Sequence, residues 1–589
     1  MSSSNKEPWS ATDNRDSTQA IEARKSLTIW PLDESNTILL NEVAPRNYTN
    51  PTQPHDIYDL VAIGAGAGGL VSSKQSARRG AKSAMISDHL AGGDCLNVGC
   101  VPSKALIRCG RAAAEARRLS KFGVTVGASG SDQSVSVNFS KVMERMRQIR
   151  ATIAPADGHE GTSATGAHVY QGRGKFTGPD TIQVSDGSVL KFKKAVIATG
   201  GRAALPDVEG LMEAPFTTNA DLFNLETLPP RMVILGSGVV ALEMAQTFAA
   251  FGSEVTVVQR ASYLFQSKGG DAEASKLVKE ALEEDGVTFL SETTTQKVET
   301  LRQVDEGDFE SLPLMKLTVK SADGPEQELE CECLLVATGR LPNVENIGLE
   351  DANVDYDPKR GVIINDLAQS PSNPNVYAVG DCAAGVPRLT HMSGEMAKVV
   401  VNNALFDDNW KISSLVVPAV MYTHPEVATV GLASEDMATK AEVEVDVFRA
   451  GLEHNDRAIT EGDRRGFVKI VTEKGGGKIL GATIVAGRAG EIINEVTLAM
   501  KHNIGLGETS VLNGMILLVL ARLFNMRCLS SRSRCPRKKH EATSSVSFMD
   551  ALGGHDNPRA FFLGASLKTG QSKSCPNNRF SLFLIENLS

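Results

Sequence analysis

The chain has 589 residues, of which 41% are hydrophobic and 22% charged, and its formal net charge is −9. This composition is typical of a globular protein with several domains, and the acidic balance gives no global attraction to nucleic acid or an anionic membrane. Nine cysteines are too few for a secreted disulfide scaffold of this length. No stretch reaches the roughly 20 apolar residues of a membrane span, and residues 1–29 lack the features of a signal or transit peptide. We therefore expect a cytoplasmic protein, with an organelle as the alternative.

The first predicted unit follows a polar stretch over residues 1–56, which we interpret as an extension or linker. The apolar run Tyr58–Ile63 predicts a strand, and the glycine-rich turn after it opens a helix. In a dinucleotide-binding unit Gly64 permits the tight turn, Gly66 lets a pyrophosphate approach the backbone, and Gly69 lets helix and strand pack closely. A tight turn without a ligand is the alternative.

The second strand of this unit is predicted over residues 83–86. The acid that binds the ribose is expected near its end. The spacing falls on Ser87, and the neighbouring Asp88 is the candidate.

The segment 92–104 reads GGDCLNVGCVPSK and places two cysteines in one glycine-flanked loop. Pro102 suits the first turn of a helix, so Cys100 is expected near the positive end of the helix dipole, where a thiolate is favoured. Zinc is not expected, because no other Cys or His pair with ligand spacing accompanies Cys95 and Cys100. The pattern indicates redox chemistry, and an inert buried pair is the alternative.

A second unit of the same pattern begins about 170 residues later with the apolar run Arg231–Leu235. Its turn has the G-x-G-x-x-A form, made by Gly236, Gly238 and Ala241. The ribose position falls at Gln259 and Arg260, where an acid would select NAD. A neutral residue followed by Arg accommodates a 2′-phosphate, so we expect NADP, with NAD and a merely solvated Arg260 as alternatives.

The later part of the chain contains a further α/β segment and a tail of different character. Short strands are expected over 468–471 and 479–485, with a helix over 490–501. Residues 512–589 carry a net charge of +7 and show no sustained helical or strand period, so we expect a divergent, disordered tail.

Residues from about 57 to 510 resemble the pyridine nucleotide-disulfide oxidoreductases, the group that contains glutathione reductase, dihydrolipoamide dehydrogenase and mercuric reductase. The motif from Gly93 to Lys104, with both cysteines, is highly specific for this group. The segments 236–243 and 418–431 most resemble mercuric reductase-like members.

The resemblance implies an FAD cofactor and roles for single residues. Cys100 would contact the flavin, Cys95 would exchange with substrate, and Lys104 and Glu243 would form an ion pair beside the flavin. Asp381 would bind the ribityl chain of FAD. Further positions expected to contact the cofactors are Gly93, Lys104, Thr199, Gly200 and Gly339.

The implied fold class is α/β, with two Rossmann-like dinucleotide-binding domains and an α+β interface domain. The expected segments are an extension (1–56), an FAD-binding domain in two parts (57–215 and 335–411), an NAD(P)-binding domain (216–334), an incomplete dimerisation domain (412–511) and the tail (512–589).

The implied function is an FAD-dependent NAD(P)H:disulfide oxidoreductase, with a small-molecule disulfide, a protein disulfide or a soft metal ion as acceptor and a homodimer as the assembly. Family members end in a His-Pro…Glu motif whose His serves the other subunit as acid/base. Here the match stops near Glu508, and the next histidine, His540, precedes Glu541 rather than Pro. A flavin diaphorase and a flavoprotein without turnover are therefore the alternatives.

Overall fold

The structure is a computed structural model that describes residues 9–10, 28–124, 135–265, 270–304, 311–322 and 324–507. The predicted disordered tail lies outside the described residues. Among the described helices, none combines the length and the apolar character needed to cross a lipid bilayer.

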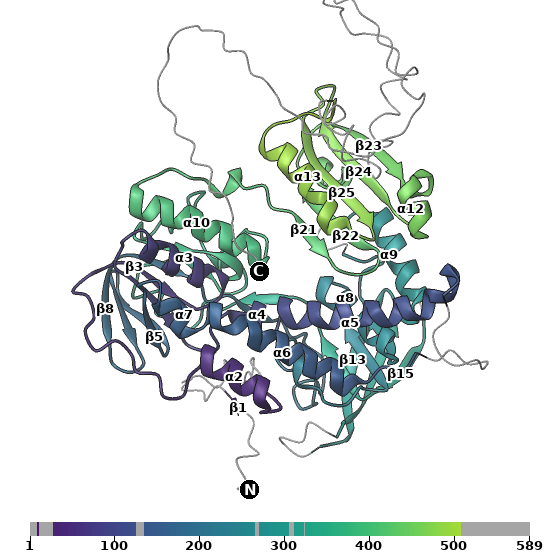
Figure 1. Ribbon diagram of the computed structural model, residues 1–589, viewed down its shortest axis with the longest axis horizontal. Coiled ribbons are helices and arrows are strands. Elements are labelled where there is room, and N and C mark those ends of the chain that lie inside the picture. Colours follow the sequence, from purple (N-terminus) through teal and green to yellow (C-terminus); the bar gives the residue numbers. More distant parts are fainter. Residues whose placement is uncertain are drawn as a thin grey trace, which may run out of the picture. The chain divides into compact units, whose positions relative to one another are not determined.

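The first sheet brings together strands that are far apart in the sequence (Figure 1). Its parallel strands, in spatial order, are β5 (His168–Gln171), β4 (Ser83–Ser87), β3 (Tyr58–Ile63), β8 (Val189–Ile197) and β20 (Val376–Ala378). The start of β8 also pairs antiparallel with β7 (Thr181–Val184), which pairs with β6 (Gly174–Gly178). Helices α3 (Ala67–Arg78) and α10 (Thr390–Phe406) pack against each other.

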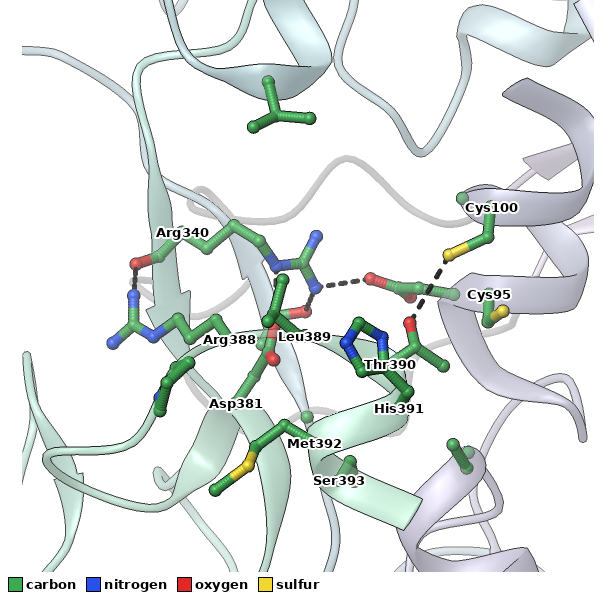
Figure 2. Close-up of a pocket in the computed structure, with 18 of the residues that line it drawn as sticks. Cys95, Cys100, Arg340, Asp381, Arg388, Leu389, Thr390, His391, Met392 and Ser393 are labelled. Atoms are coloured by element: carbon green, nitrogen blue, oxygen red, sulfur yellow. Dashed lines mark hydrogen bonds and ion pairs between the residues drawn. The ribbon is translucent and has the colours of Figure 1, made fainter. Parts of the chain in front are cut away.

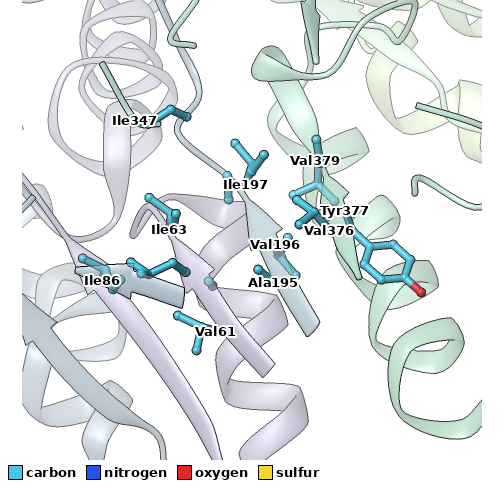
Figure 3. Packing of buried hydrophobic residues seen from close by; sticks show 14 of the residues in the cluster. Val61, Ile63, Ile86, Ala195, Val196, Ile197, Ile347, Val376, Tyr377 and Val379 are labelled. Carbon is cyan, nitrogen blue, oxygen red and sulfur yellow. The ribbon is translucent and has the colours of Figure 1, made fainter. Parts of the chain in front are cut away.

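The core of this sheet explains its apolar strands. Val61, Ile63, Val196, Ile197 and Tyr377 belong to one buried cluster that joins β3, β8 and β20 (Figure 3). Parallel strands that are covered on both faces read as nearly continuous apolar runs, as Tyr58–Ile63 does. The carboxyl ends of the parallel strands carry the loops of the site.

The second sheet repeats the pattern. Its parallel strands are, in order, β12 (Val287–Leu290), β11 (Glu254–Val258), β10 (Arg231–Leu235) and β16 (Cys333–Val336). Helices α8 (Val239–Phe251) and α9 (Ala272–Glu284) belong to this unit, as does an antiparallel sheet of β13 (Thr293–Arg302), β14 (Leu314–Ser321) and β15 (Glu326–Cys331).

The third sheet is antiparallel, in the order β21 (Ala419–Met421), β22 (Glu426–Gly431), β25 (Ile479–Ala486), β24 (Phe467–Glu473) and β23 (Val445–Gly451). Helix α13 (Ala489–Lys501) packs on β22 and β25, and the short helices α11 (Glu435–Lys440) and α12 (Asp456–Glu461) complete the unit. The strands and the helix expected in this part of the sequence are present.

Three further two-stranded sheets lie outside the three main sheets. They pair β9 (Gly201–Ala203) with β17 (Arg340–Pro342), β18 (Tyr356–Asp357) with β19 (Gly361–Val362), and β1 (Trp9–Ser10) with β2 (Thr28–Ile29).

The cysteine motif forms α4 (Gly93–Asn97) and the start of α5 (Cys100–Arg118), and α6 (Phe139–Asp157) packs on both of these helices. The short helix α7 (His159–Ser163) follows α6. The stretch interpreted as a linker contains a further helix, α2 (Glu34–Val43), which packs on α6. Asp33 caps this helix by accepting a hydrogen bond from the Asn36 backbone N–H. The buried apolar face of α2 consists of only three residues, Leu39, Leu40 and Val43. The predominantly polar composition of residues 1–56 therefore did not indicate this helix.

Candidate active site

One cavity of about 1800 Å³ is lined by both glycine-rich turns and by the cysteine motif. Pockets for a single small ligand usually measure about 300–1,000 Å³. The cavity therefore has room for more than one ligand, which is the arrangement that electron transfer between two nucleotide cofactors requires.

The first glycine turn has the geometry of a pyrophosphate cradle. A Cβ on Gly64, whose φ is +110°, would lie 2.3 Å from the Ala198 carbonyl oxygen, and one on Gly69 would lie 1.7 Å from the Gly64 carbonyl oxygen. These two glycines are needed for packing. A Cβ on Gly66 would meet nothing closer than the Gly93 Cα at 3.8 Å, so the backbone at this helix start is open to a ligand.

Asp88 follows β4 and lines the cavity. The Ser87 hydroxyl donates to the His89 carbonyl oxygen, so its proton is already committed. The Asp88 carboxylate is 42% exposed, and its Oδ1 lies 3.9 Å from His89 Nδ1. Asp88 thus lies at the end of β4 with its carboxylate partly open to solvent.

The two glycines of the second turn also differ in the space around a Cβ. A Cβ on Gly236 would lie 2.6 Å from the Ala337 carbonyl oxygen, whereas no described atom lies within 4 Å of a Cβ on Gly238. Gly238 caps α8 and lines the cavity, and Ala241 is fully buried in the first turn of the helix. Gly238 is thus the open position for phosphate.

Neither residue at the ribose position of the second unit is among the described residues that line the cavity. Gln259 is buried, and its Nε2 donates to the Ser291 hydroxyl at 2.9 Å. Arg260 is exposed and is not one of the described residues that line the cavity. The Arg260 side chain is thus exposed, shortly after the end of β11.

Cys95 and Cys100 are free thiols at adjoining helix ends: α5 begins at Cys100, as predicted, and Cys95 lies in α4. The Cys100 sulfur lies 3.4 Å from the Thr390 hydroxyl, at the start of α10 (Figure 2). A hydrogen bond from the Cys95 thiol, the Thr390 hydroxyl and the Lys104 charge together lower the pKa of Cys100 to about 6. The same hydrogen bond and burial raise the pKa of Cys95 far above its ordinary value. The opposite directions of the two pKa shifts favour the thiolate at Cys100 over the thiolate at Cys95.

The expected ion pair is present, because Lys104 Nζ lies 2.8 Å from Glu243 Oε2. Glu243 is only 3% exposed, and its second oxygen accepts the Tyr422 backbone N–H at 2.9 Å. Lys104 also lies over the Tyr422 ring, 4.7 Å from its centroid. Tyr422, which the sequence alone did not indicate, thus contacts both members of the ion pair.

Asp381 is joined to the cysteine motif through a residue that the sequence reasoning missed. Arg340 donates to Asp381 at 2.9 Å and to Asp94, next to Cys95, at 2.6 Å (Figure 2). The only sequence signal for Arg340 was its place after Gly339, at the end of a glycine turn.

The remaining predicted cofactor positions also line the cavity. Thr199 donates from its hydroxyl to the Asn343 carbonyl oxygen at 2.6 Å. No described atom lies within 4 Å of a Cβ on Gly200. Gly93, Thr199, Gly200 and Gly339 all line the cavity.

Two other side chains, those of His391 and Val239, also line the cavity. His391, beside Thr390, donates from Nε2 to the Pro418 carbonyl oxygen at 2.6 Å (Figure 2). Val239, in the first turn of α8, lines the cavity and is partly exposed.

Comparison with known proteins agrees with this geometry. Residues 58–397 match the pyridine nucleotide-disulphide oxidoreductase family, and residues 417–510 match the dimerisation domain of that family. The chain is 32% identical over 449 residues to the mercuric reductase of Lysinibacillus sphaericus, covering 76% of this chain and 78% of the relative. It is 32% identical over 448 residues to a dihydrolipoyl dehydrogenase of Staphylococcus aureus, covering 75% and 90%. The structure of the HOCl-induced flavoprotein disulfide reductase RclA of Escherichia coli shares the fold, with a TM-score of 0.66 at 22% identity over 80% of this chain and 98% of that chain.

The fold and the cavity define a flavoprotein oxidoreductase with two dinucleotide-binding units. The chain belongs to the pyridine nucleotide-disulphide oxidoreductase family, whose members use FAD and NAD(P)H.

Proposed function

We propose that this enzyme passes electrons from NADPH to the pair Cys95 and Cys100 and from there to an external disulfide or a soft metal ion. The observation that carries the proposal is the position of Cys100: it begins α5, faces the Thr390 hydroxyl and lies in the cavity that both glycine turns line. The open positions Gly66, Gly200 and Gly238 fit two dinucleotides along that cavity. When bound, FAD supplies two-electron transfer between the pyridine nucleotide and a disulfide.

The two cysteines have different roles, which follow from the different pKa values of their thiols. Cys100 is the thiolate that faces the flavin side of the cavity, and Cys95 is the exchange thiol. The Cys95 proton is held by the Cys100 sulfur, so Cys100 can accept that proton when Cys95 attacks. Lys104 balances the negative charge at Cys100, and Glu243 orients Lys104.

Reduction of an external disulfide consumes one dithiol. Cys95 attacks one sulfur of the acceptor RSSR, a mixed disulfide forms, and one RS⁻ leaves. Cys100 then attacks the Cys95 sulfur, which closes the Cys95–Cys100 disulfide and releases the second RS⁻. Because Cys100 is the thiolate, the reduced pair holds one proton, that of Cys95. This proton passes through Cys100 to one released RS⁻, and the second RS⁻ takes a proton from water, so the acceptor gains two electrons and two protons.

The acceptor class and the assembly rest on the relatives. One is named for mercuric ion and another for a dihydrolipoyl substrate, which supports a soft metal ion or a disulfide as acceptor. The match to a dimerisation domain supports a homodimer. The preference for NADPH rests on Gln259 and Arg260, which stand where an NAD-selective unit carries an acid.

Steady-state rates of wild type, Cys95→Ser and Cys100→Ser with NADPH test the proposal. Ferricyanide reports electron transfer that does not need the cysteines, and dithiobis(nitrobenzoate), glutathione disulfide, lipoamide and Hg²⁺ report transfer through them. We expect both variants to keep ferricyanide reduction and to lose reduction of the other acceptors. A wild type that reduces only ferricyanide would be a diaphorase, and the proposal would then be wrong.

A further inference from the structure

Residues 28–44, here called the N-terminal brace, lie outside the segment that matches the family. They nevertheless contact residues 91–97, here called the redox loop, which include the short helix α4 and carry Cys95. The brace consists of β2, α2 and their connection. Figure 1 shows α2 beside α6, on which it packs.

A single buried cation links the brace to the redox loop. Arg150, on α6, has an exposed fraction of 0%. One of its terminal nitrogens donates to the Asn97 carbonyl oxygen at 2.8 Å, and the other donates to the Asn36 side-chain oxygen at 2.9 Å. Asn36, which is also fully buried, donates from its own amide to the Pro31 carbonyl oxygen at 2.7 Å. Among the described residues Arg150 Nε has no hydrogen-bond partner, so the buried guanidinium depends on these two bonds, one to the loop and one to the brace.

The other end of the redox loop is held by backbone and apolar contacts. The Ala91 N–H donates to the Val43 carbonyl oxygen, the last residue of α2, at 2.9 Å. Leu39, Leu40, Val43, Leu90, Ala91 and Leu96 belong to one buried apolar cluster. Within the loop, the Asn97 amide donates to the carbonyl oxygens of Ala91 and Gly93, both at 2.9 Å. The brace thus fixes both ends of the segment in which Cys95 lies.

Because Arg150 carries a buried charge, the link between the brace and the redox loop depends on both of its hydrogen-bond partners. Its hydrogen-bond partners toward the brace and the loop are neutral, and burial lowers the pKa of Arg150 to about 10. A buried charge that loses a hydrogen-bond partner is left with an uncompensated desolvation cost. Any movement of the Asn97 carbonyl away from Arg150 is therefore opposed.

We propose that the N-terminal brace, acting through Arg150, positions the redox loop and so sets the stability of the Cys95–Cys100 disulfide. A disulfide forms only when the two Cα atoms are about 4.4–6.8 Å apart. A segment held at both ends restricts the movement of Cys95 relative to Cys100, which raises the effective concentration of one thiol at the other. Arg150 is a positioning residue in this scheme. The inference rests on the proposed function, because it takes these two cysteines as the redox pair.

The test measures the disulfide equilibrium in the full-length holoenzyme. Wild type, Asn36→Leu, Arg150→Met and Arg150→Lys are equilibrated with mixtures of reduced and oxidised dithiothreitol, and mass spectrometry after alkylation counts the thiols. Two electrons and two protons pass from dithiothreitol, which cyclises, to the Cys95–Cys100 disulfide. Arg147→Met is the matched control, because Arg147 joins the same helix to Asp33 of the brace at 2.6 Å without a described hydrogen bond to the redox loop.

We expect Asn36→Leu and Arg150→Met to shift the equilibrium about three- to tenfold toward the dithiol, because a looser loop has a lower effective concentration. Arg150→Lys should recover part of the shift, and Arg147→Met should stay within twofold of wild type. FAD content and the thermal transition are measured on every variant. An unchanged equilibrium in Asn36→Leu and Arg150→Met overturns the inference, as does loss of FAD and of the folded state in both. A wild type without a Cys95–Cys100 disulfide under oxidising conditions would overturn the proposed function instead.

Discussion

Lys104 Nζ lies 2.8 Å from Glu243 Oε2, so an ion pair joins the helix that begins at Cys100 to the helix that follows the second glycine turn. The two charges act on Cys100 in opposite directions: Lys104 lowers its pKa and Glu243 raises it. The pair therefore connects the two dinucleotide-binding units and also tunes the thiolate.

Opposite changes in Cys100 acidity are the expected result of removing each charge. Lys104→Met should raise the pKa of Cys100, and Glu243→Gln should lower it further. At pH 5.5 the rate of Cys100 alkylation by iodoacetamide should fall in the first variant and rise in the second, each by roughly two- to tenfold. Changes in the same direction would show that the pair acts through packing rather than charge.

Removing the Thr390 hydroxyl should destabilise the Cys100 thiolate. Thr390→Val keeps the shape of the side chain but loses the hydrogen bond to the Cys100 sulfur, so the pKa of Cys100 should rise. A hydrogen bond to a charged group contributes about 1.5–3 kcal/mol, and sulfur is a weaker acceptor than oxygen. We expect a roughly threefold or greater fall in alkylation rate at pH 6. Thr390→Ser is the control and should remain near wild type.

The reduced pair should show one acidic and one resistant thiol. Because the pKa of Cys100 is lowered to about 6, its thiolate is present above that pH and is lost as the pH falls through it. Cys95 should resist alkylation until well above the usual range, because its proton is bound to the Cys100 sulfur. In Cys100→Ser, Cys95 should react at lower pH than in wild type. Equal pH profiles for both thiols, read by mass spectrometry, would contradict the assignment.

The two glycines of the second turn should respond differently to alanine. Gly236→Ala forces a Cβ to within 2.6 Å of a carbonyl oxygen at a φ of +108°, so its thermal transition should fall. Gly238→Ala has free space and ordinary φ, so the fold and the FAD content should be unchanged while KM for NADPH rises roughly tenfold. If Gly238→Ala leaves KM unchanged, the phosphate does not bind at this turn.

Arg260 is expected to select the 2′-phosphate. Arg260→Ala should lower kcat/KM for NADPH roughly tenfold or more, the size of one lost charge-assisted hydrogen bond, and should leave NADH use and FAD content unaltered. Lys276→Ala, an exposed cation on α9 of the same unit, is the matched control. A higher kcat/KM for NADH in wild type would show that the unit selects NAD.

The sequence predicted the elements that follow strict local rules. The strand Tyr58–Ile63, the strand Arg231–Leu235 and the helix start at Cys100 each depend on apolar runs, glycine turns or a proline near the helix start. Thr390 and Arg340 were missed because their roles arise only when distant segments meet in the cavity. The helix α2 was missed because its buried face is short and its main polar partner, Arg150, lies 114 residues away from Asn36. The segment boundaries and the roles of single site residues stay predictions.

The pairing of β20 with the end of β8 has a consequence for biosynthesis. Val376 and Ala195 are register partners, so the edge of the first sheet at β8 has no neighbour until a strand about 180 residues later leaves the ribosome. At roughly 5–20 residues per second this delay is about 10–35 s. The second unit, whose sheet runs from β10 to β16, is complete before β20 emerges. Nascent chains therefore present an apolar, unpaired strand edge during this interval, and that edge is a natural point for chaperone engagement.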